Sequence, residues 1–365
     1  MDQPASPIHD TNTPIPSQEL GIRRRTVSLE DETARVTLTL EGGHIAEFLH
    51  KPSGINPLWQ PPWPSIEPSA YHPARHPEYG GTVESRLLAG IRGHNLCLDV
   101  FGPPSPEEAA AGIDVHGESS VAPYQHEQTG DRELTLRATF PLAQLRFERR
   151  LRLLPGATLA IRETVENLTP LDRPLAWTHH VTLGPPFIEP GVTRLDMPVR
   201  RSMVFEPDLG PDGHYAPGAV FDWPHAPRRD GATTDLRLYP AAERSAGITS
   251  HLTDEAAQQA WFLAFHPGLQ LVFGHSWTRA DFPWIVIWEE NRSRTAPPWN
   301  GRTITRGIEF GASPFPETRR AMITRGSLFG APAYRWLPAR ASLSVEYYAF
   351  AYTAAHMPTA PPQIY

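Results

Sequence analysis

Hydrophobic and polar residues alternate along many stretches of the chain, and most of these stretches are bounded by proline or glycine. Over residues 33–40, Val36, Leu38 and Leu40 fall on one face and polar residues fall on the other. A period of two predicts β-strands, because successive side chains of a strand point to opposite sides of the sheet. Residues 145–153 follow the pattern, with Arg149 intruding on the apolar face. Further strands are predicted over residues 132–140, 159–167, 175–183, 236–239, 261–265, 269–273, 284–288 and 342–352.

Helical signals are few. Residues 106–111 begin with proline and residues 253–260 begin with Thr253, a suitable N-cap, so both are predicted as short helices. The sequence Leu-Pro-Gly-Ala at 154–157 predicts a tight hairpin. Strands with so little helix between them favour antiparallel pairing, and the 41 prolines suit long loops. The predicted fold class is mainly β, a large antiparallel β-sandwich with few short helices.

One large domain is predicted. Residues 1–20 are polar, contain four prolines and are interpreted as a flexible N-terminal arm, which leaves residues 21–365 as a single β-sandwich domain. The proline-rich stretch 57–77 carries large aromatic residues, which favours a loop packed onto the body over an interdomain linker. The N-terminus lacks the basic start and apolar run of a secretory signal, and no apolar run reaches membrane-spanning length. A soluble, cytoplasmic protein without membrane partners is expected.

Composition narrows the function classes. The net charge of −7 argues against nucleic acid as a partner, because phosphate binding needs a basic surface. Lys51 is the only lysine, which limits Schiff-base chemistry to that residue. The single cysteine, Cys97, cannot form an intrachain disulfide or a thiolate metal site and is expected to be a small buried residue. Phosphate-binding and dinucleotide-binding glycine motifs are missing from the sequence. Neither a cofactor nor a metal ion is expected.

Two histidine motifs could carry chemistry. Gly117 follows His116 and lets backbone and imidazole approach a ligand closely, although a histidine on a surface turn gives the same motif. His179 and His180 lie in the strand predicted over 175–183, so at most one of them faces a given pocket. A histidine there can act as an acid or a base near neutral pH. The alternative is one core histidine bonded to a backbone carbonyl beside one surface histidine.

A third candidate lies where the apolar strand 284–288 runs into Glu289 and Glu290. A carboxylate at the mouth of a buried strand can be partly desolvated, which raises its pKa and makes it a stronger base when ionised. The alternative is two solvated acids paired with Arg292 or Arg294. One or two tryptophans are expected to pack against a sugar ring, and the rest to serve core or loop packing. The candidates are Trp59, Trp63, Trp223, Trp284, Trp288 and Trp299.

Taken in order, these pieces resemble the galactose mutarotase-like superfamily, which includes the aldose 1-epimerases. The order and rough spacing cover most of the chain. Glu118 stands where the family has a second glycine after its His-Gly, and residues 181–183 replace its aromatic-Asn-Leu. The segments that resemble the family's motifs are 40–46, 84–95, 116–117, 174–180, 221–223 and 288–291.

The resemblance implies a cofactor-independent aldose 1-epimerase that interconverts the α and β anomers of a sugar. Its motifs place the catalytic acid, which protonates the ring oxygen, on His180. They place the base, which takes the C1 hydroxyl proton, on Glu289, with Glu290 competing for that role. The candidate substrate-binding residues are Arg86, His116, Asp222, His179, Glu290 and Trp299.

Two other functions stay open at this point. A carbohydrate-binding protein on the same scaffold, without turnover, fits the imperfect motifs. A glycoside hydrolase or lyase would need two carboxylates, such as Glu289 and Glu118, about 5–10 Å apart across the sugar. The epimerase hypothesis requires that His180 and Glu289 converge on one pocket.

Overall fold

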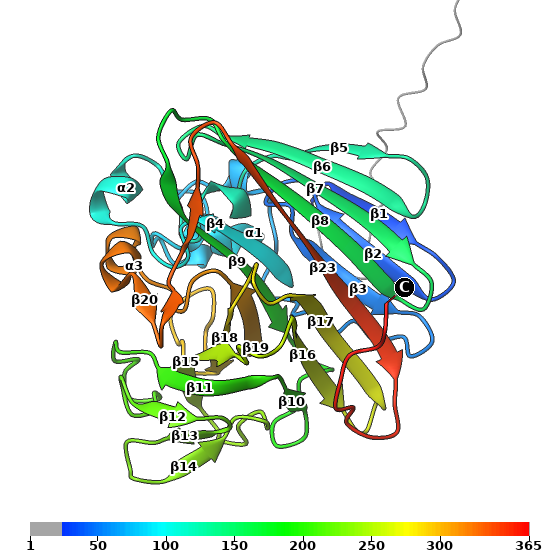
Figure 1. Cartoon of the computed structure of the whole chain (residues 1–365), viewed down its shortest axis with the longest axis vertical. Helices are drawn as coiled ribbons and strands as arrows, with labels where there is room; N and C mark the ends of the chain where they lie inside the picture. Colours follow the sequence, from blue (N-terminus) through cyan, green and yellow to red (C-terminus); the bar gives the residue numbers. More distant parts are fainter. Residues whose placement is uncertain (1–23, 365) are drawn as a thin grey trace, which may run out of the picture.

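The computed structural model describes residues 24–364, and within them the chain forms two large antiparallel β-sheets that pack face to face (Figure 1). The helices in this part of the chain are all short. The predicted mainly β sandwich is therefore confirmed. The predicted arm, residues 1–20, lies outside the described residues, so the division at residue 21 stays a prediction.

The larger sheet contains 11 strands within residues 24–364, and β9 lies near its middle. β9 pairs with β4 on one side and with β19 on the other. In spatial order the strands are β1 (Thr26–Glu30), β2 (Ala34–Thr39), β3 (Ile45–His50), β4 (His94–Asp99), β9 (Arg173–Leu183), β19 (Ile304–Gly311), β18 (Trp284–Asn291), β15 (Ser245–Thr253), β11 (Val199–Val204) and β12 (Val220–Asp222), with β22 (Arg335–Leu337) paired to one end of β9.

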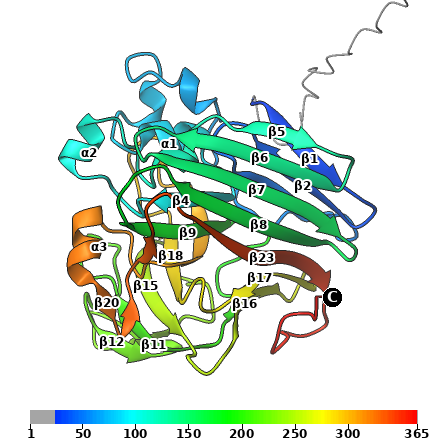
Figure 2. The ribbon, with the colours of Figure 1, turned by 45° about the horizontal axis from the view of Figure 1, so that its top comes forward.

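The second sheet contains 8 strands within the same residues, and Figure 2 shows β6, β7, β8 and β23 side by side on the front of the molecule. In spatial order its strands are β10 (Arg194–Asp196), β16 (Gln259–His266), β17 (Leu271–Thr278), β23 (Ser342–Thr353), β8 (Thr158–Asn167), β7 (Leu145–Leu154), β6 (Glu133–Phe140) and β5 (Gln125–Gln128). The remaining elements are the hairpins β13 (His225–Pro227)–β14 (Thr233–Asp235) and β20 (Ser327–Leu328)–β21 (Ala331–Pro332), the helices α1 (Ser85–Gly90), α2 (Pro106–Ala110) and α3 (Arg319–Arg325), and 3-10 turns at Pro68–Ala70, Pro77–Tyr79 and Glu118–Ser120.

Several local predictions are confirmed. Along β7, buried and exposed residues alternate as the period of two requires. Residues 154–157 connect β7 to β8 as a hairpin, in which Gly156 has a φ of 75°. Helix α2 is capped by Ser105, whose hydroxyl accepts the Glu108 amide hydrogen. Cys97 is buried and free.

Two local predictions are wrong. Residues 253–260 form no helix, because Thr253 ends β15 and its hydroxyl donates to the Pro283 carbonyl instead of capping a helix. Residues 236–239 form a turn after β14, anchored on β10 by the Leu195 amide, which donates to the Arg237 carbonyl at 2.7 Å. In both places, pairing with a distant strand overrides the local signal.

The proline-rich stretch 57–77 packs onto the body, as predicted. Trp59 and Trp63 lie in a cluster with Tyr79 and the apolar residues of α1. The indole nitrogen of Trp63 donates to the carbonyl of Leu88 at 2.8 Å. This layer covers part of the larger sheet on the side away from the second sheet. Across residues 24–364, no helix is both long and apolar enough to cross a membrane.

A buried polar network joins the two sheets inside the apolar core. The Arg149 side chain on β7 donates to Glu163 on β8 at 2.7 Å. Trp177 on β9 and Tyr347 on β23 donate to the same carboxylate at 3.0 Å and 2.9 Å. Arg149 also donates to the Gly43 carbonyl at 2.8 Å. Four strands of two sheets therefore meet at one carboxylate that is fully removed from water.

Charge balance sets the state of this network. Burial opposes ionisation of Glu163, but His179 and Arg149 outweigh it and hold the pKa of the carboxyl below its usual value. The guanidinium thus keeps an ionised partner in the core. A buried pair of this kind contributes little by itself, but it is costly to break because one charge is then left uncompensated.

We predict that Glu163→Gln lowers the free energy of unfolding by about 3–5 kcal/mol, because Arg149 loses its counter-charge in the core. Denaturant unfolding followed by circular dichroism measures the change. Arg146→Ala, on the strand of Arg149, is the control, since Arg146 is exposed and its partner Glu166 is only half-buried. Equal stability of the two variants would contradict a central role for the network.

Candidate functional site

The row of residues across the middle of the larger sheet defines the candidate site. The register places Asn95 on β4 opposite His180 on β9, and His180 opposite Glu309 on β19. Directly opposed residues of antiparallel strands point to the same face. These three side chains therefore share the face of the sheet that is turned away from the second sheet.

His180 and Glu309 are in direct contact. The imidazole Nε2 lies 3.0 Å from a Glu309 carboxyl oxygen, and Nδ1 lies 2.8 Å from the Thr182 hydroxyl. The two residues are 6% and 2% exposed, so water is nearly excluded from the contact. Because both ring nitrogens of His180 have partners, the imidazole is fixed in orientation, as a group that presents a proton at one position must be.

Burial controls the protonation of this pair. Burial, with the neighbouring His116 adding to it, lowers the pKa of His180 well below its ordinary value. Burial likewise raises the pKa of Glu309 well above its ordinary value. Both shifts favour the uncharged forms, a neutral imidazole and a protonated carboxyl. The contact can therefore pass a proton from one group to the other without a net charge in the site.

His116 faces the pair from a loop. Its ring lies 5.4 Å from the His180 ring, centroid to centroid, and stacks on Phe101 at 5.9 Å. Its Nδ1 accepts the Gly102 amide hydrogen at 3.1 Å, so the neutral ring carries its proton on Nε2. Burial, and then the charge of Arg294, lower the pKa of His116 to about 4. His116 is thus a neutral hydrogen-bond donor at the site.

The chain needs an unusual backbone to place His116. His116 has a φ of 67° and Gly117 a φ of 82°. A Cβ at Gly117 would lie 2.3 Å from the Leu98 carbonyl oxygen, so only glycine fits between the loop and β4. The glycine after the histidine therefore has the role that the sequence suggested: it lets this loop press against the sheet.

An aromatic and cationic wall closes one side. The Trp288 ring lies 5.5 Å from the His180 ring and 6.1 Å from the Trp299 ring. The Arg294 guanidinium lies 4.7 Å from the Trp299 ring centre and 5.7 Å from that of Trp288. Arg294 also pairs with Glu84 at 3.2 Å. Trp288 is half-buried, so its ring is available to an apolar ligand face.

Glu290 holds this wall in place. Its carboxylate accepts the amide hydrogens of Ser293 and Arg294 at 2.7 Å and 3.0 Å, and the Ser293 hydroxyl hydrogen at 2.5 Å. These bonds fix the turn that carries Arg294. Glu290 therefore lies on the His180 face of the sheet, as a support for the wall, and its oxygens are already engaged.

Gly307 leaves room beside the pair. It lies opposite Thr182 on β9 and Trp288 on β18, on the same face as His180. A Cβ there would lie 2.9 Å from a Glu309 carboxyl oxygen, 3.2 Å from the Trp288 ring and 3.3 Å from the His180 ring. A side chain at this position would therefore collide with Glu309, Trp288 or His180.

Arg86 lies on α1 beside the site loops. It is half-exposed and pairs with Asp114 at 3.0 Å, two residues before His116.

Asn95, on the other side of His180, is fully buried, and its amide oxygen has no hydrogen-bond partner among the described residues. Within residues 24–364, no group of three or more His, Cys, Asp and Glu side chains is arranged to hold a metal ion.

The structure does not bring Glu289 to His180. Glu289 lies opposite Arg306, one residue out of phase with Trp288, and so points to the core side of the sheet. Its carboxylate pairs with Arg306 at 2.8 Å and accepts the Tyr215 hydroxyl hydrogen at 2.7 Å. The expectation that His180 and Glu289 converge on one pocket is contradicted by this register.

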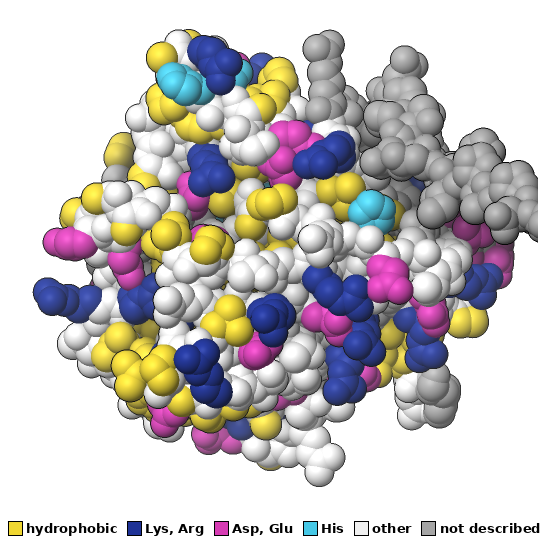
Figure 3. Space-filling model, turned by 90° about the horizontal axis from the view of Figure 1, so that it is seen from above, with side chains coloured by type: hydrophobic (Ala, Val, Ile, Leu, Met, Phe, Trp, Pro, Cys, Tyr) yellow, Lys and Arg dark blue, Asp and Glu magenta, His cyan; other side chains and the backbone are white. Residues whose placement is uncertain are grey.

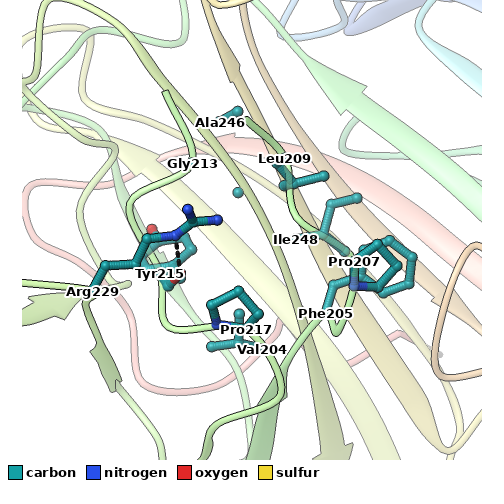
Figure 4. Close-up of a pocket in the computed structure, with 11 residues that line it drawn as sticks. Val204, Phe205, Pro207, Leu209, Gly213, Tyr215, Pro217, Arg229, Ala246 and Ile248 are labelled. Carbon is teal, nitrogen blue, oxygen red and sulfur yellow. Dashed lines mark hydrogen bonds between the residues drawn. The ribbon is translucent and has the colours of Figure 1, made fainter. Parts of the chain in front are cut away.

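The crevice beside the Tyr215 loop, next to Glu289, is too small for a sugar. Figure 4 shows the crevice between β15 and the loop that carries Tyr215, where the Arg229 side chain donates to the Tyr215 carbonyl. Its volume of about 10 Å³ is room for about one water molecule. A Cβ at Gly247 would lie 2.3 Å from the Tyr215 ring. Glu289, Arg306 and Tyr215 thus fasten this loop to the sheet.

Two further candidates lie elsewhere. His179 is fully buried in the core, stacked on Phe310 at 4.7 Å and 3.5 Å from Glu163, so it belongs to the network between the sheets. Asp222 is exposed on the edge strand β12. Four strands separate β12 from β9, which places Asp222 roughly 24 Å from His180 at about 4.8 Å per strand.

The structure also gives no support to a glycoside hydrolase or lyase that uses Glu118 and Glu289 as paired acids. The Glu118 carboxylate accepts the Ala143 amide hydrogen at 2.6 Å, at the turn between β6 and β7. Glu289 is held by Arg306 and Tyr215. No contact joins the two carboxylates among the described residues, and each is committed to a structural partner.

Comparisons with known proteins identify the fold. No known family model and no curated protein matches the sequence. Solved structures are similar to it, among them a candidate aldose 1-epimerase from Klebsiella pneumoniae, with a TM-score of 0.61 and 14% identity over 88% of this chain and 77% of that one. A galactose mutarotase-like protein from Lactobacillus casei gives a TM-score of 0.57 and 13% identity, over 90% of this chain and 100% of that one.

A third solved structure, the GalM/aldose epimerase homologue from C. elegans, gives a TM-score of 0.58 and 10% identity, over 90% of this chain and 99% of that one. Similarity at such low identity shows the fold. The chain is a β-sandwich of the galactose mutarotase-like fold, with a divergent sequence.

We predict that Glu289→Gln lowers the free energy of unfolding by about 3 kcal/mol, because Arg306 is left as an uncompensated charge that is 2% exposed. Thermal and denaturant unfolding of the variant measure the effect. A Glu289→Gln variant as stable as the wild type would show that the pair does not fasten the loop to the sheet.

Proposed function

We propose that the chain is an aldose 1-epimerase-like isomerase in which His180 and Glu309, rather than His180 and Glu289, exchange protons with the sugar. The observation that carries the proposal is the 3.0 Å contact between the imidazole and the carboxyl in a site nearly closed to water. The fold of the solved neighbours supports the same class of chemistry.

Ring opening needs one base and one acid acting together. Transfer of the carboxyl proton across the contact gives an ionised Glu309 and a protonated His180. Glu309 then takes the C1 hydroxyl proton as the C1 carbonyl forms, and the electrons of the C1–ring-oxygen bond pass to the ring oxygen, which takes a proton from His180. Rotation about C1–C2 and closure with the roles reversed give the other anomer.

The surrounding residues have matching roles in this proposal. The half-buried Trp288 ring offers a flat surface for the apolar face of a pyranose. His116 donates from Nε2 towards the oxygen atoms on which charge develops. Arg294 and Arg86, each already paired with a carboxylate, form a charge-balanced rim that suits the hydroxyl groups of a sugar.

A carbohydrate-binding protein without turnover is the second candidate. The observation that favours it is that both ring nitrogens of His180 already have partners, Thr182 and Glu309. In that case the two side chains would orient a bound sugar rather than transfer protons. The two functions differ in a rate that can be measured directly.

We predict that the protein accelerates the equilibration of freshly dissolved α-D-glucose or α-D-galactose, followed by proton NMR at the anomeric signal. Glu309→Gln and His180→Asn should each lower the rate about 100-fold or more, because each removes one of the two proton-transfer groups. Glu289→Gln is the control and, at a temperature where the variant is folded, should keep the rate, since that carboxylate faces the other side of the sheet.

Each outcome of this experiment is informative. Loss of rate in Glu289→Gln, with the rate kept in Glu309→Gln, would overturn the assignment of Glu309. Equilibration no faster than in buffer, with sugar binding at the Trp288 site, would leave the binding protein as the function.

We also predict that Gly307→Ala slows the same reaction by about tenfold, because the added methyl group occupies the space between Trp288 and the Glu309 carboxyl. Michaelis–Menten analysis should show a raised KM. Thermal unfolding checks that the variant is folded. A folded variant with unchanged KM would show that the sugar does not approach past Gly307.

A further inference from the structure

The second sheet carries a groove on its outer face, on the side of the molecule opposite to the His180 site. Its volume is about 470 Å³, within the range of about 300–1,000 Å³ typical of small-molecule sites. Strands β6, β7, β8 and β23 form its floor, and residues of β5 extend it. Figure 2 shows these strands adjacent to one another.

The small side chain of Ala160 leaves a hollow in the floor of the groove. Ala160 on β8 lies opposite Arg152 on β7 and opposite Tyr348 on β23. Its methyl group is short beside these two side chains, so the floor is lower at Ala160 than around it. The Tyr348 hydroxyl donates to Glu346 at 2.5 Å, which holds the ring at the edge of the hollow.

The arginines of the groove are arranged unfavourably for stability alone. Arg150 on β7 lies directly opposite Arg162 on β8, and both are exposed. Like charges opposed across a strand pair destabilise a sheet. Arg150 pairs with Glu148 at 2.7 Å. Arg152 lies opposite Glu133 and Arg162 opposite Glu346 across the strands, but neither arginine forms an ion pair with a described residue. Three arginines thus surround Ala160, and two of them have no carboxylate within ion-pair distance among the described residues.

Carboxylates in the same groove restrict the ligand. Glu127, Glu133 and Glu346 also line it, and they would repel a densely charged chain such as nucleic acid. The wider surface is also mixed: Figure 3 shows acidic and basic side chains interspersed over the face seen from above. A ligand that carries separate anionic groups among many hydroxyls matches both features, since its anions pair with arginine and its hydroxyls donate to glutamate.

We infer that this groove binds an acidic oligosaccharide, with a sugar carboxylate between Arg152 and Arg162 and a ring against Tyr348. The groove is independent of the proposed epimerase site, because the His180 face belongs to the other sheet. The protein would then hold an anionic glycan on one face while the other face acts on free sugar.

Isothermal titration with trigalacturonic acid, with maltotriose as the neutral probe, tests the inference. The wild type should bind trigalacturonic acid and not maltotriose, and added salt should weaken the binding. Arg162→Ala should weaken it about tenfold, the loss of one charged hydrogen bond. Ala160→Leu should abolish it by filling the hollow. Arg146→Ala, on the neighbouring strand β7 but outside the groove, is the control and should leave the binding unchanged.

The outcomes separate this groove from the proposed epimerase site. His180→Asn should bind trigalacturonic acid as the wild type does, even if no mutarotation is found. No saturable binding by the wild type, equal binding of maltotriose, or unchanged binding by folded Arg162→Ala and Ala160→Leu would overturn the inference. Thermal unfolding of both variants establishes that they are folded.

Discussion

The arrangement of the sandwich depends on one buried carboxylate. Glu163 receives hydrogen bonds from β7, β9 and β23 while it lies on β8, so it fixes the distance and register between the two sheets. Apolar packing alone tolerates sliding, because it is not directional. Hydrogen bonds to a buried charge are directional and costly to leave unmade. The position of β9 relative to the second sheet is therefore set by Trp177 on that strand, three residues from His180.

The site follows from this position because side chains alternate along β9. Trp177 and His179 face Glu163, so His180 must face the other way. The cross-strand register then selects which carboxylate can reach it: Glu309 is in phase with His180, and Glu289 is out of phase. The same strands contribute one face to the core and the opposite face to the site. A change that shifts β9 against the second sheet would also shift His180 against Glu309.

The mainly β fold could be predicted from the sequence, since strands such as β6, β7 and β8 are exposed on one face and show the period of two. The hydrophobic pattern does not distinguish His180 from His179, because β9 is buried on both faces, and only the family resemblance placed the acid on His180. The Glu289 interpretation failed for the same reason, since β18 is apolar throughout its first half. The strand of Glu309 was missed because Gly307 and Gly311 interrupt it and suggest a turn. Cross-strand pairing decides which histidine and which carboxylate face the site, and this pairing cannot be read from a single sequence.

The glycines that concealed β19 are explained by the site itself. A Cβ at Gly311 would lie 2.3 Å from the Thr178 hydroxyl, and one at Gly307 would touch Trp288, His180 and Glu309. Glycine weakens a strand, so two in eight residues lower the intrinsic stability of β19. Pairing with β9 and β18 on both sides compensates for that weakness. β19 is therefore the strand that is hardest to recognise from the local sequence, and it is also the strand that brings Glu309 to His180. Both features follow from its glycines, because side chains at Gly307 and Gly311 would collide with their neighbours on β9 and β18.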